Sequence, residues 1–415
     1  MFEDRSRSIK QGLNICYFGT YHSTYPGNRV LIEGLRRNGI QVFECHVPLG
    51  ELTRSKYHTY GTLLSKITLI FQMLRSYLLL IWKYIRTPQH EVLIVGYLGQ
   101  FDIFLAGAIK LLSGKPVVFN PMFSLYDTVV LDRALYKPGS IPAAVLRLLD
   151  YLAFRISDIT FLDCQEHIKI WTEEIGCAPR KVRPLNFGAD DGVFFPRAMK
   201  RRDNEKFQVL FYGTFMPSQG IPTIVRAAKL LEDQEVAFEI IGHGQVSEEV
   251  AALAEELKVR NVDFIPWVQF EELPLRMSRA DVCLGMFGTT LKTKRCFANK
   301  IVQALAMGRP MITSDVAATR EFLRDRRDVL FCKAGDPTSL AEAVLTLRED
   351  PDLREKIGEN GFRLFVDAFS PDAVGGRAKQ YLRELVEVRP RGPSFSNTFL
   401  DRCQRYHYHR VGSEP

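Results

Sequence analysis

Cysteine patterns that hold disulfides or zinc are missing from this sequence. Its eight cysteines are scattered, none forms a CxxC pair, and no cysteine–histidine group has the spacing of a zinc site. Free thiols in a reducing compartment are the simplest interpretation. The first residues also lack the apolar core of a signal peptide, so we expect a cytoplasmic location.

Several nucleotide-binding and hydrolytic motifs are missing as well. There is no GxxxxGK[ST] loop, no HExxH and no GxSxG elbow. The first apolar run leads into FGTYHSTYPGN, which does not fit the G-x-G-x-x-G turn of dinucleotide enzymes. Gly242-His243-Gly244 follows a later run, but no third glycine comes at the required spacing. A dehydrogenase is therefore the last of the alternatives.

Neither composition nor net charge is extreme. Apolar residues make up 46% and charged residues 25% of the 415 residues, which excludes a disordered or collagen-like chain. The net charge of +7 is mild for this length, and we expect no nucleic acid as a partner. A chain of this length has room for about two or three domains with large apolar cores.

Short apolar runs alternate with helical patterns in both halves of the chain. The runs are rich in Val, Ile and Phe without strict polar alternation, which is typical of strands buried on both faces. In the first half we predict strands at 13–19, 40–46, 91–96, 116–120 and 159–163. Helical patterns lie near 28–38, 62–86, 101–113, 141–157 and 164–176. In the second half we predict strands at 207–213, 237–242, 262–266, 281–287 and 309–313.

This alternation predicts an α/β protein with two Rossmann-like, doubly wound domains that face each other across a cleft. The N-terminal domain spans 1–188 and a polar linker spans 189–206. We expect the C-terminal domain to span 207–370, a helix that crosses back to the first domain to span 371–388, and a flexible tail to span 389–415. Ligands of such folds bind at the carboxyl ends of the strands, so the cleft is the default site.

The segment 285–315 carries a basic loop directly ahead of a helix. Lys292, Lys294 and Arg295 precede a helix that begins near Asn299. A helix N-terminus with three cations suits a diphosphate. A solvated basic loop is the alternative interpretation.

Several motifs, in order along the chain, resemble retaining glycosyltransferases of family 4, which have the GT-B fold. KIVQALAMGRPMITSD (300–315) resembles the helix, turn and strand around that family's Glu-x7-Glu motif. YGTFMPSQGIPTIVRAAKLL (212–231) resembles the start of the family's second domain. GTYHSTYPGNRVLIEGLRRNG, FNPMFSLYDTVVLDR and LNFGADDGVFFP resemble a branch of bacterial members with surface-polysaccharide products.

The resemblance implies transfer of a sugar from a nucleotide diphospho-sugar to an acceptor with retention. The C-terminal domain then holds the nucleotide and the N-terminal domain holds the acceptor. The nucleotide diphospho-sugar is a substrate, and neither a cofactor nor a metal is implied. Asp190-Asp191 in the linker is interpreted as a turn rather than a metal site. From the local patterns and the resemblance together, the expected donor-binding residues are Gly19, Arg29, Gly213, Thr214, Gln219, Gly242, His243, Lys292, Lys294, Arg295, Asn299, Lys300 and Gln303.

Four of these positions depart from the family pattern. The two glutamates of the motif fall at Arg295 and Gln303, and two basic residues that grip the diphosphate fall at Thr214 and Gln219. Gln303 can still accept and donate one hydrogen bond each to a ribose. We expect the basic loop to replace the missing cations, so that Lys294→Ala weakens donor binding strongly and Gln219→Ala matters little.

Candidates in the N-terminal domain lie in two loops. Gly19 and Gly27 bracket the first loop, where backbone N–H groups and Arg29 can approach a phosphate, or which is a plain strand–helix turn. His22 in that loop and Asp127 in the second are candidates for acting on the acceptor hydroxyl. Asn120 ends the fourth predicted strand and orients a sugar or shapes a turn.

The segment 62–86 is a long amphipathic helix without acidic residues. Arg75 interrupts it, so it does not span a bilayer. It either lies on an anionic membrane or packs on the domain core with a solvated basic side. Its apolar stripe consists of Leu64, Ile67, Phe71, Leu74, Leu78, Ile81 and Ile85.

The expected activity is glycosyl transfer onto a surface polysaccharide or glycolipid, with a saccharide or lipid-linked acceptor, by a protein peripheral at the inner face of the plasma membrane. Two alternatives stay open. The chain is a GT-B binding or scaffold protein that has lost catalysis, or it is a nucleotide-sugar epimerase.

Overall fold

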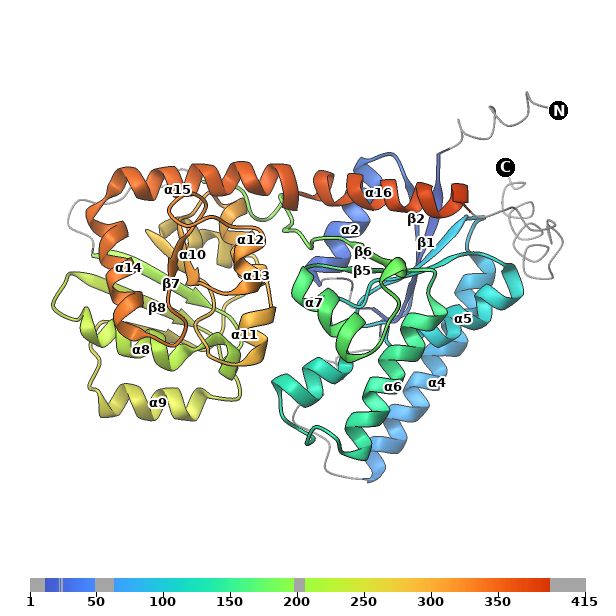
Figure 1. Cartoon of the computed structure of the whole chain (residues 1–415), viewed down its shortest axis with the longest axis horizontal. Coiled ribbons are helices and arrows are strands. Elements are labelled where there is room, and N and C mark those ends of the chain that lie inside the picture. The colour runs from blue at the N-terminus through green and yellow to red at the C-terminus, as the bar shows by residue number, and fades with distance from the viewer. Residues whose placement is uncertain (1–11, 22, 24, 49–62, 198–205, 389–415) are drawn as a thin grey trace, which may run out of the picture.

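The computed structural model describes residues 12–21, 23, 25–48, 63–197 and 206–388. His22, the linker segment 198–205 and the tail 389–415 lie outside the described residues. Two α/β domains lie next to each other, and a long run of helix bridges them (Figure 1). Each domain is built on one six-stranded sheet.

The N-terminal sheet has the order β2-β1-β3-β4-β5-β6 with every pair parallel. Five strands lie where the apolar runs predict them, and β6 is a three-residue edge strand without such a run. The strands are β1 (Asn14–Gly19), β2 (Gln41–His46), β3 (Val92–Val95), β4 (Val117–Phe119), β5 (Ile159–Leu162) and β6 (Val182–Pro184).

Helices cover both faces of this sheet. The helices α4 (Leu63–Arg86), α5 (Asp102–Ser113) and α6 (Ile141–Ile156) share one apolar core with its first face. On the other face α2 (Pro26–Arg37) packs together with α16 (Pro371–Val388) from the end of the chain. After β5 the chain continues as α7 (Gln165–Lys169) and the π-helical η3 (Ile170–Glu174).

The C-terminal sheet has the order β12-β11-β10-β7-β8-β9 and is also parallel throughout. Its strands are β7 (Phe207–Tyr212), β8 (Val236–Ile241), β9 (Val262–Ile265), β10 (Val282–Leu284), β11 (Met311–Ser314) and β12 (Leu330–Cys332). One face carries α8 (Ile221–Leu230), α9 (Ser247–Glu256) and α14 (Pro337–Glu349). The other carries α10 (Leu273–Arg279), α12 (Asn299–Ala306) and the π-helical η6 (Phe365–Phe369).

The chain returns to the N-terminal domain through α15 (Pro351–Leu364), η6 and α16, which run along one side of both domains (Figure 1). Glycines allow α16 to lie directly on α2, because a Cβ on Gly375 would overlap the backbone of Gly34. Asn38 at the end of α2 donates to the Asp372 carbonyl (3.0 Å), and Lys379 donates to the Asn38 carbonyl. The C-terminal helix is therefore a structural part of the N-terminal domain.

The middle of the apolar stripe predicted on 62–86 faces away from the sheet. Phe71, Leu74 and Leu78 are 68%, 57% and 61% exposed, whereas Leu80 and Tyr84 are buried against the core. Arg75 and Lys83 are exposed on the same helix. In the part of the chain that the structure describes, no helix has the length and apolar character needed to cross a membrane.

Candidate functional site

Two glycines end adjacent strands of the C-terminal sheet. Gly213 after β7 and Gly242 after β8 both have φ of 148°. A Cβ on Gly242 would overlap the Gly213 carbonyl, so the two strand ends approach as closely as only glycine permits. Of the neighbouring candidates, Thr214 and the His243 side chain are exposed, and the His243 carbonyl accepts from Phe215 N (3.1 Å).

Lys300 places a buried cation at the first of these glycines. Its Nζ lies 2.9 Å from the position that a Cβ on Gly213 would take. The same Nζ donates to Gln219 Oε1 (2.5 Å) and lies 3.8 Å from the centre of the Phe211 ring. Burial lowers the pKa of Lys300 well below its ordinary value. No carboxylate pairs with it among the described residues, so its charge is available to an anion.

Gln303 lies one turn further along α12 and is nearly buried. Its Oε1 accepts from the Tyr212 hydroxyl (3.0 Å), which also lies 3.2 Å from the Lys300 carbonyl. The carbonyl half of the Gln303 amide is thus engaged inside the domain. The Nε2 group, a donor, is the half that a ribose hydroxyl can use.

The basic loop forms the short helix α11 (Leu291–Arg295) and docks on the N-terminal domain. Lys292 Nζ pairs with Asp127 Oδ2 at 2.5 Å, and both side chains are more than nine-tenths buried. Burial lowers the pKa of Lys292, but Asp127, Cys296 and Asp132 together outweigh this effect and the pKa ends above its ordinary value. Arg295 pairs with Glu174 at 2.6 Å, whereas Lys294 is exposed. Two of the three cations therefore already face carboxylates of the other domain.

Asp102 holds the first loop of the N-terminal domain in place through hydrogen bonds. Gly19 has φ of 136°, and a Cβ there would lie 2.5 Å from Asp102 Oδ2. Thr20 N donates to the same oxygen (2.6 Å). Arg29 is half-exposed and pairs with Asp190 in the linker (2.7 Å), where Asp190 Oδ1 also accepts from Gly192 N as in an Asx turn. These contacts favour the interpretation of the loop after β1 and of Asp190-Asp191 in the linker as turns.

Asn120 and Asn299 lie on the two sides of the domain boundary. Asn120, after β4, lines a cavity of about 20 Å³ together with Asp163 and Asn186. Asn299 opens α12, and its Oδ1 is buried with no hydrogen-bond partner in the described ranges. The Tyr25 phenol of α2's N-cap lies beside this amide, and burial raises the pKa of Tyr25 to about 12.

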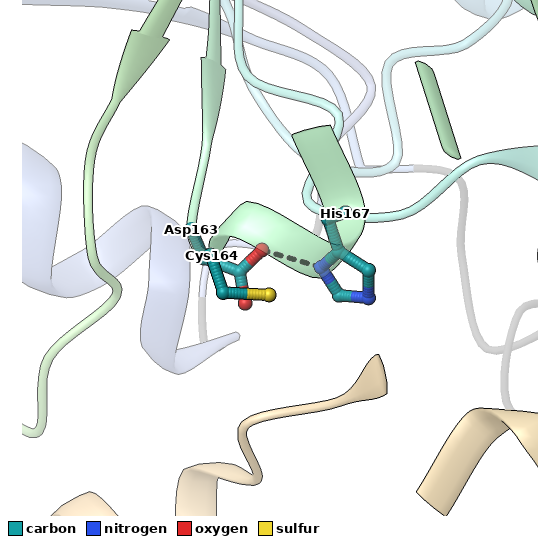
Figure 2. Close-up of side chains that lie close together, drawn as sticks. All are labelled: Asp163, Cys164 and His167. Atoms are coloured by element: carbon teal, nitrogen blue, oxygen red, sulfur yellow. Dashed lines mark hydrogen bonds and ion pairs between the residues drawn. The ribbon is translucent and has the colours of Figure 1, made fainter. Parts of the chain in front are cut away.

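The structure also brings together three residues that the sequence analysis does not single out. Asp163, Cys164 and His167 lie at the end of β5 and the start of α7 (Figure 2). His167 Nδ1 and Asp163 Oδ1 are 2.5 Å apart, and both side chains are buried. Within the part of the chain that the structure describes, His167 Nε2 and Asp163 Oδ2 have no hydrogen-bond partner. The only sequence signal is an aspartate at the end of a predicted strand with a histidine four residues later.

These three side chains can each offer one atom within 4.8 Å of the others, which is close enough for a metal ion. However, Nδ1 of His167 is already bonded to Asp163. Burial also raises the pKa of the Cys164 thiol, which disfavours the thiolate that zinc requires. The geometry is that of a hydrogen-bonded carboxylate–imidazole pair.

Comparison with known sequences shows which family the C-terminal domain is similar to. Residues 206–350 match the family described as "Glycosyl transferases group 1". A lipopolysaccharide core biosynthesis glycosyltransferase, LpsD of Rhizobium meliloti, is 27% identical over 58% of this chain and 73% of its own length. The chain spans about half the length of other curated relatives that it matches.

Solved structures share the fold over nearly the whole chain. Sucrose-phosphate synthase from Thermosynechococcus elongatus superposes with a TM-score of 0.67 and 17% identity, covering 92% of this chain and all of that one. Anabaena HepE in complex with UDP-glucose superposes with a TM-score of 0.62 and 12% identity, covering 90% and 100%. The two facing Rossmann-like domains confirm the predicted GT-B architecture.

Proposed function

Because residues 206–350 are a Glycosyl transferases group 1 domain within a GT-B fold, we propose that this chain transfers a sugar from a nucleotide diphospho-sugar to a saccharide or lipid-linked acceptor. The transfer keeps the anomeric configuration. Lys300 beside Gly213 carries the proposal, since a buried cation without a carboxylate suits a diphosphate. No step of this binding calls for a metal ion or a cofactor.

A role in cell-surface polysaccharide or glycolipid synthesis is the second part of the proposal. It is supported by LpsD, whose name assigns it to lipopolysaccharide core biosynthesis. The exposed apolar and basic side chains of α4 support a location at the inner face of the plasma membrane. α6, in the same layer, adds Ile141 and Leu148, which are 82% and 54% exposed.

Thermal denaturation with nucleotides tests the donor site first. The panel is UDP, GDP, ADP and dTDP with UDP-glucose, GDP-mannose, ADP-glucose and dTDP-rhamnose. A ligand at about 100 times its dissociation constant adds about 2.7 kcal/mol, which is visible as a higher melting temperature. A shift with one base identifies the donor class.

The remaining outcomes separate the alternatives. No shift with any nucleotide contradicts the donor site and favours the binding or scaffold protein, which the engaged Lys292 and Arg295 also favour. Conversion of the donor sugar in the absence of any acceptor favours the epimerase. Retention itself is tested by NMR of the anomeric proton in the product, and an inverted product contradicts that part of the proposal.

A further inference from the structure

The Asp163–His167 pair is a buried polar group with unused hydrogen-bonding capacity. A carboxylate only accepts hydrogen bonds, so the proton between Oδ1 and Nδ1 belongs to His167 Nδ1. In the neutral ring Nε2 then carries the lone pair and is an acceptor. Nε2 and Asp163 Oδ2 are both buried without a partner among the described residues. Such atoms are costly unless a ligand or water satisfies them.

The pair lies against the C-terminal domain rather than deep in its own. Cys164 Sγ is 3.5 Å from the Arg295 carbonyl, and Gln165 N donates to Glu321 (2.8 Å) in the other domain. The Phe123 ring is in contact with His167 on one side (5.5 Å between rings) and with Lys292 Nζ (4.4 Å from the ring centre). The Phe123 ring therefore links His167 to Lys292 in the segment that leads into α12.

The charged side chains of α11 offer no acceptor to a sugar at this boundary, and the Glu321 carboxylate of the same domain already accepts from Gln165 N. The charged side chains of α11, Lys292, Lys294 and Arg295, are all hydrogen-bond donors. Sugar hydroxyls need acceptors for their protons, and proteins usually supply carboxylates and imidazoles. Arg295 occupies the first glutamate position of the motif, and its side chain forms an ion pair with Glu174. Asp163 and His167 provide two unused acceptors beside it.

We infer that the Asp163–His167 pair binds hydroxyl groups of the sugar that the donor carries. A hydroxyl donates to His167 Nε2 and a second donates to Asp163 Oδ2, while Asp163 Oδ1 holds the ring in place. The inference rests on the proposed function, because it names the sugar subsite of the same donor site. Arg295 of α11 and Glu321, directly after α13 (Ala317–Arg320), contact the neighbouring Cys164 and Gln165, so we expect the sugar to enter when the domains move apart.

The test measures what the sugar adds to nucleotide affinity. Dissociation constants are determined for each nucleoside diphosphate and its sugar derivative, from UDP and UDP-glucose to dTDP and dTDP-rhamnose. His167→Asn keeps a donor to Asp163 and removes Nε2, and Asp163→Asn keeps the shape of the carboxylate. His90→Asn is the matched control, since His90 is equally buried in the same domain but bonds Tyr84 and Pro88.

For the donor that wild-type protein binds, both site variants are expected to lose about tenfold in affinity for the nucleotide sugar. Their affinity for the bare diphosphate stays within twofold, and His90→Asn changes neither. The inference is overturned if both site variants keep the wild-type ratio of the two affinities. It is also overturned if wild-type protein binds a diphosphate but gains nothing from any sugar. Wild-type protein that binds no nucleotide contradicts the proposed function itself.

Discussion

A buried lysine without a carboxylate partner costs free energy unless a ligand takes up its charge. Lys300 is such a residue, and among the described residues its Nζ contacts the Gln219 amide, the Phe211 ring and, more distantly, the Tyr212 ring. Gln219 stands where the family pattern has a basic residue, so α12 supplies from the opposite side a cation that this loop lacks. The charge of Lys300 beside Gly213 therefore comes from α12 and not from the loop that contains Gln219.

We predict that Lys300→Met leaves the unliganded protein at least as stable as wild type, because it removes a desolvated charge. The melting-temperature shift produced by the bound nucleotide disappears. Lys294→Met removes the same charge from an exposed position. If Lys294→Met abolishes the shift and Lys300→Met retains it, the basic loop binds the diphosphate, as the sequence analysis expects, and Lys300 does not.

Nucleotide-sugar affinity is predicted to depend on pH through the same residue. Burial lowers the pKa of Lys300, and a bound diphosphate raises it again. Binding therefore takes up a proton, and affinity falls as pH rises through the lowered pKa. Calorimetry in two buffers of different ionisation enthalpy measures the proton uptake. Proton uptake that persists in Lys300→Met contradicts this assignment.

At the scale of the element, α16 depends on glycine where it crosses α2. We predict that Gly375→Ala destabilises the protein by about 3 kcal/mol, because the added Cβ overlaps the Gly34 backbone. Gly376→Ala on the same helix is the matched control. Its Cβ would lie 3.3 Å from the Asn38 side chain, and alanine favours a helix interior, so stability is unchanged or rises. Equal melting temperatures for the two variants would contradict close packing at Gly375.

The stripe on α4 predicts binding to anionic lipid. Wild-type protein is expected to float with vesicles of phosphatidylglycerol and phosphatidylcholine at low salt, and less at high salt. Replacing Leu78 and Trp82 with serine reduces flotation at least fivefold. Replacing Leu275 and Trp267 with serine, at exposed apolar sites of the C-terminal domain, leaves it unchanged. Wild-type protein that stays soluble in both salts rules out the membrane surface.

For the whole molecule, the Lys292–Asp127 ion pair controls how the domains meet. Asp127→Asn leaves Lys292 buried without its ion-pair partner and with only the more distant Asp132 carboxylate, which costs up to about 3 to 5 kcal/mol in a closed cleft. We predict that the domains open instead, and that hydrogen exchange rises in 123–127 and 291–296. Glu174→Gln breaks the more exposed pair with Arg295 and has a small effect. Unchanged exchange in Asp127→Asn would show that the pair does not hold the cleft closed.

Much of the fold follows from local patterns. Parallel strands buried on both faces require apolar runs, and ten strands lie at the runs. The strand β6 has no such signal, and β12 lies in a run of only four apolar residues that the sequence analysis does not list; each is a three-residue edge of its sheet. The sequence shows that α4 is amphipathic. It does not show which side of the helix faces the sheet, because packing decides that.

The sequence by itself determined the two Rossmann-like domains and the segments that end at their cleft, because both follow from short-range periodicity and glycine turns. Only the tertiary structure decided which side chains meet there. Lys292 and Asp127 are 165 residues apart in the sequence. The sequence analysis assigns Lys292 to the diphosphate and Asp127 to the acceptor hydroxyl, whereas in the structure the two side chains form one ion pair. Lys300 at Gly213 and the Asp163–His167 pair at the domain boundary likewise depend on how helices pack onto sheets and how the domains face each other. No local pattern encodes such long-range contacts.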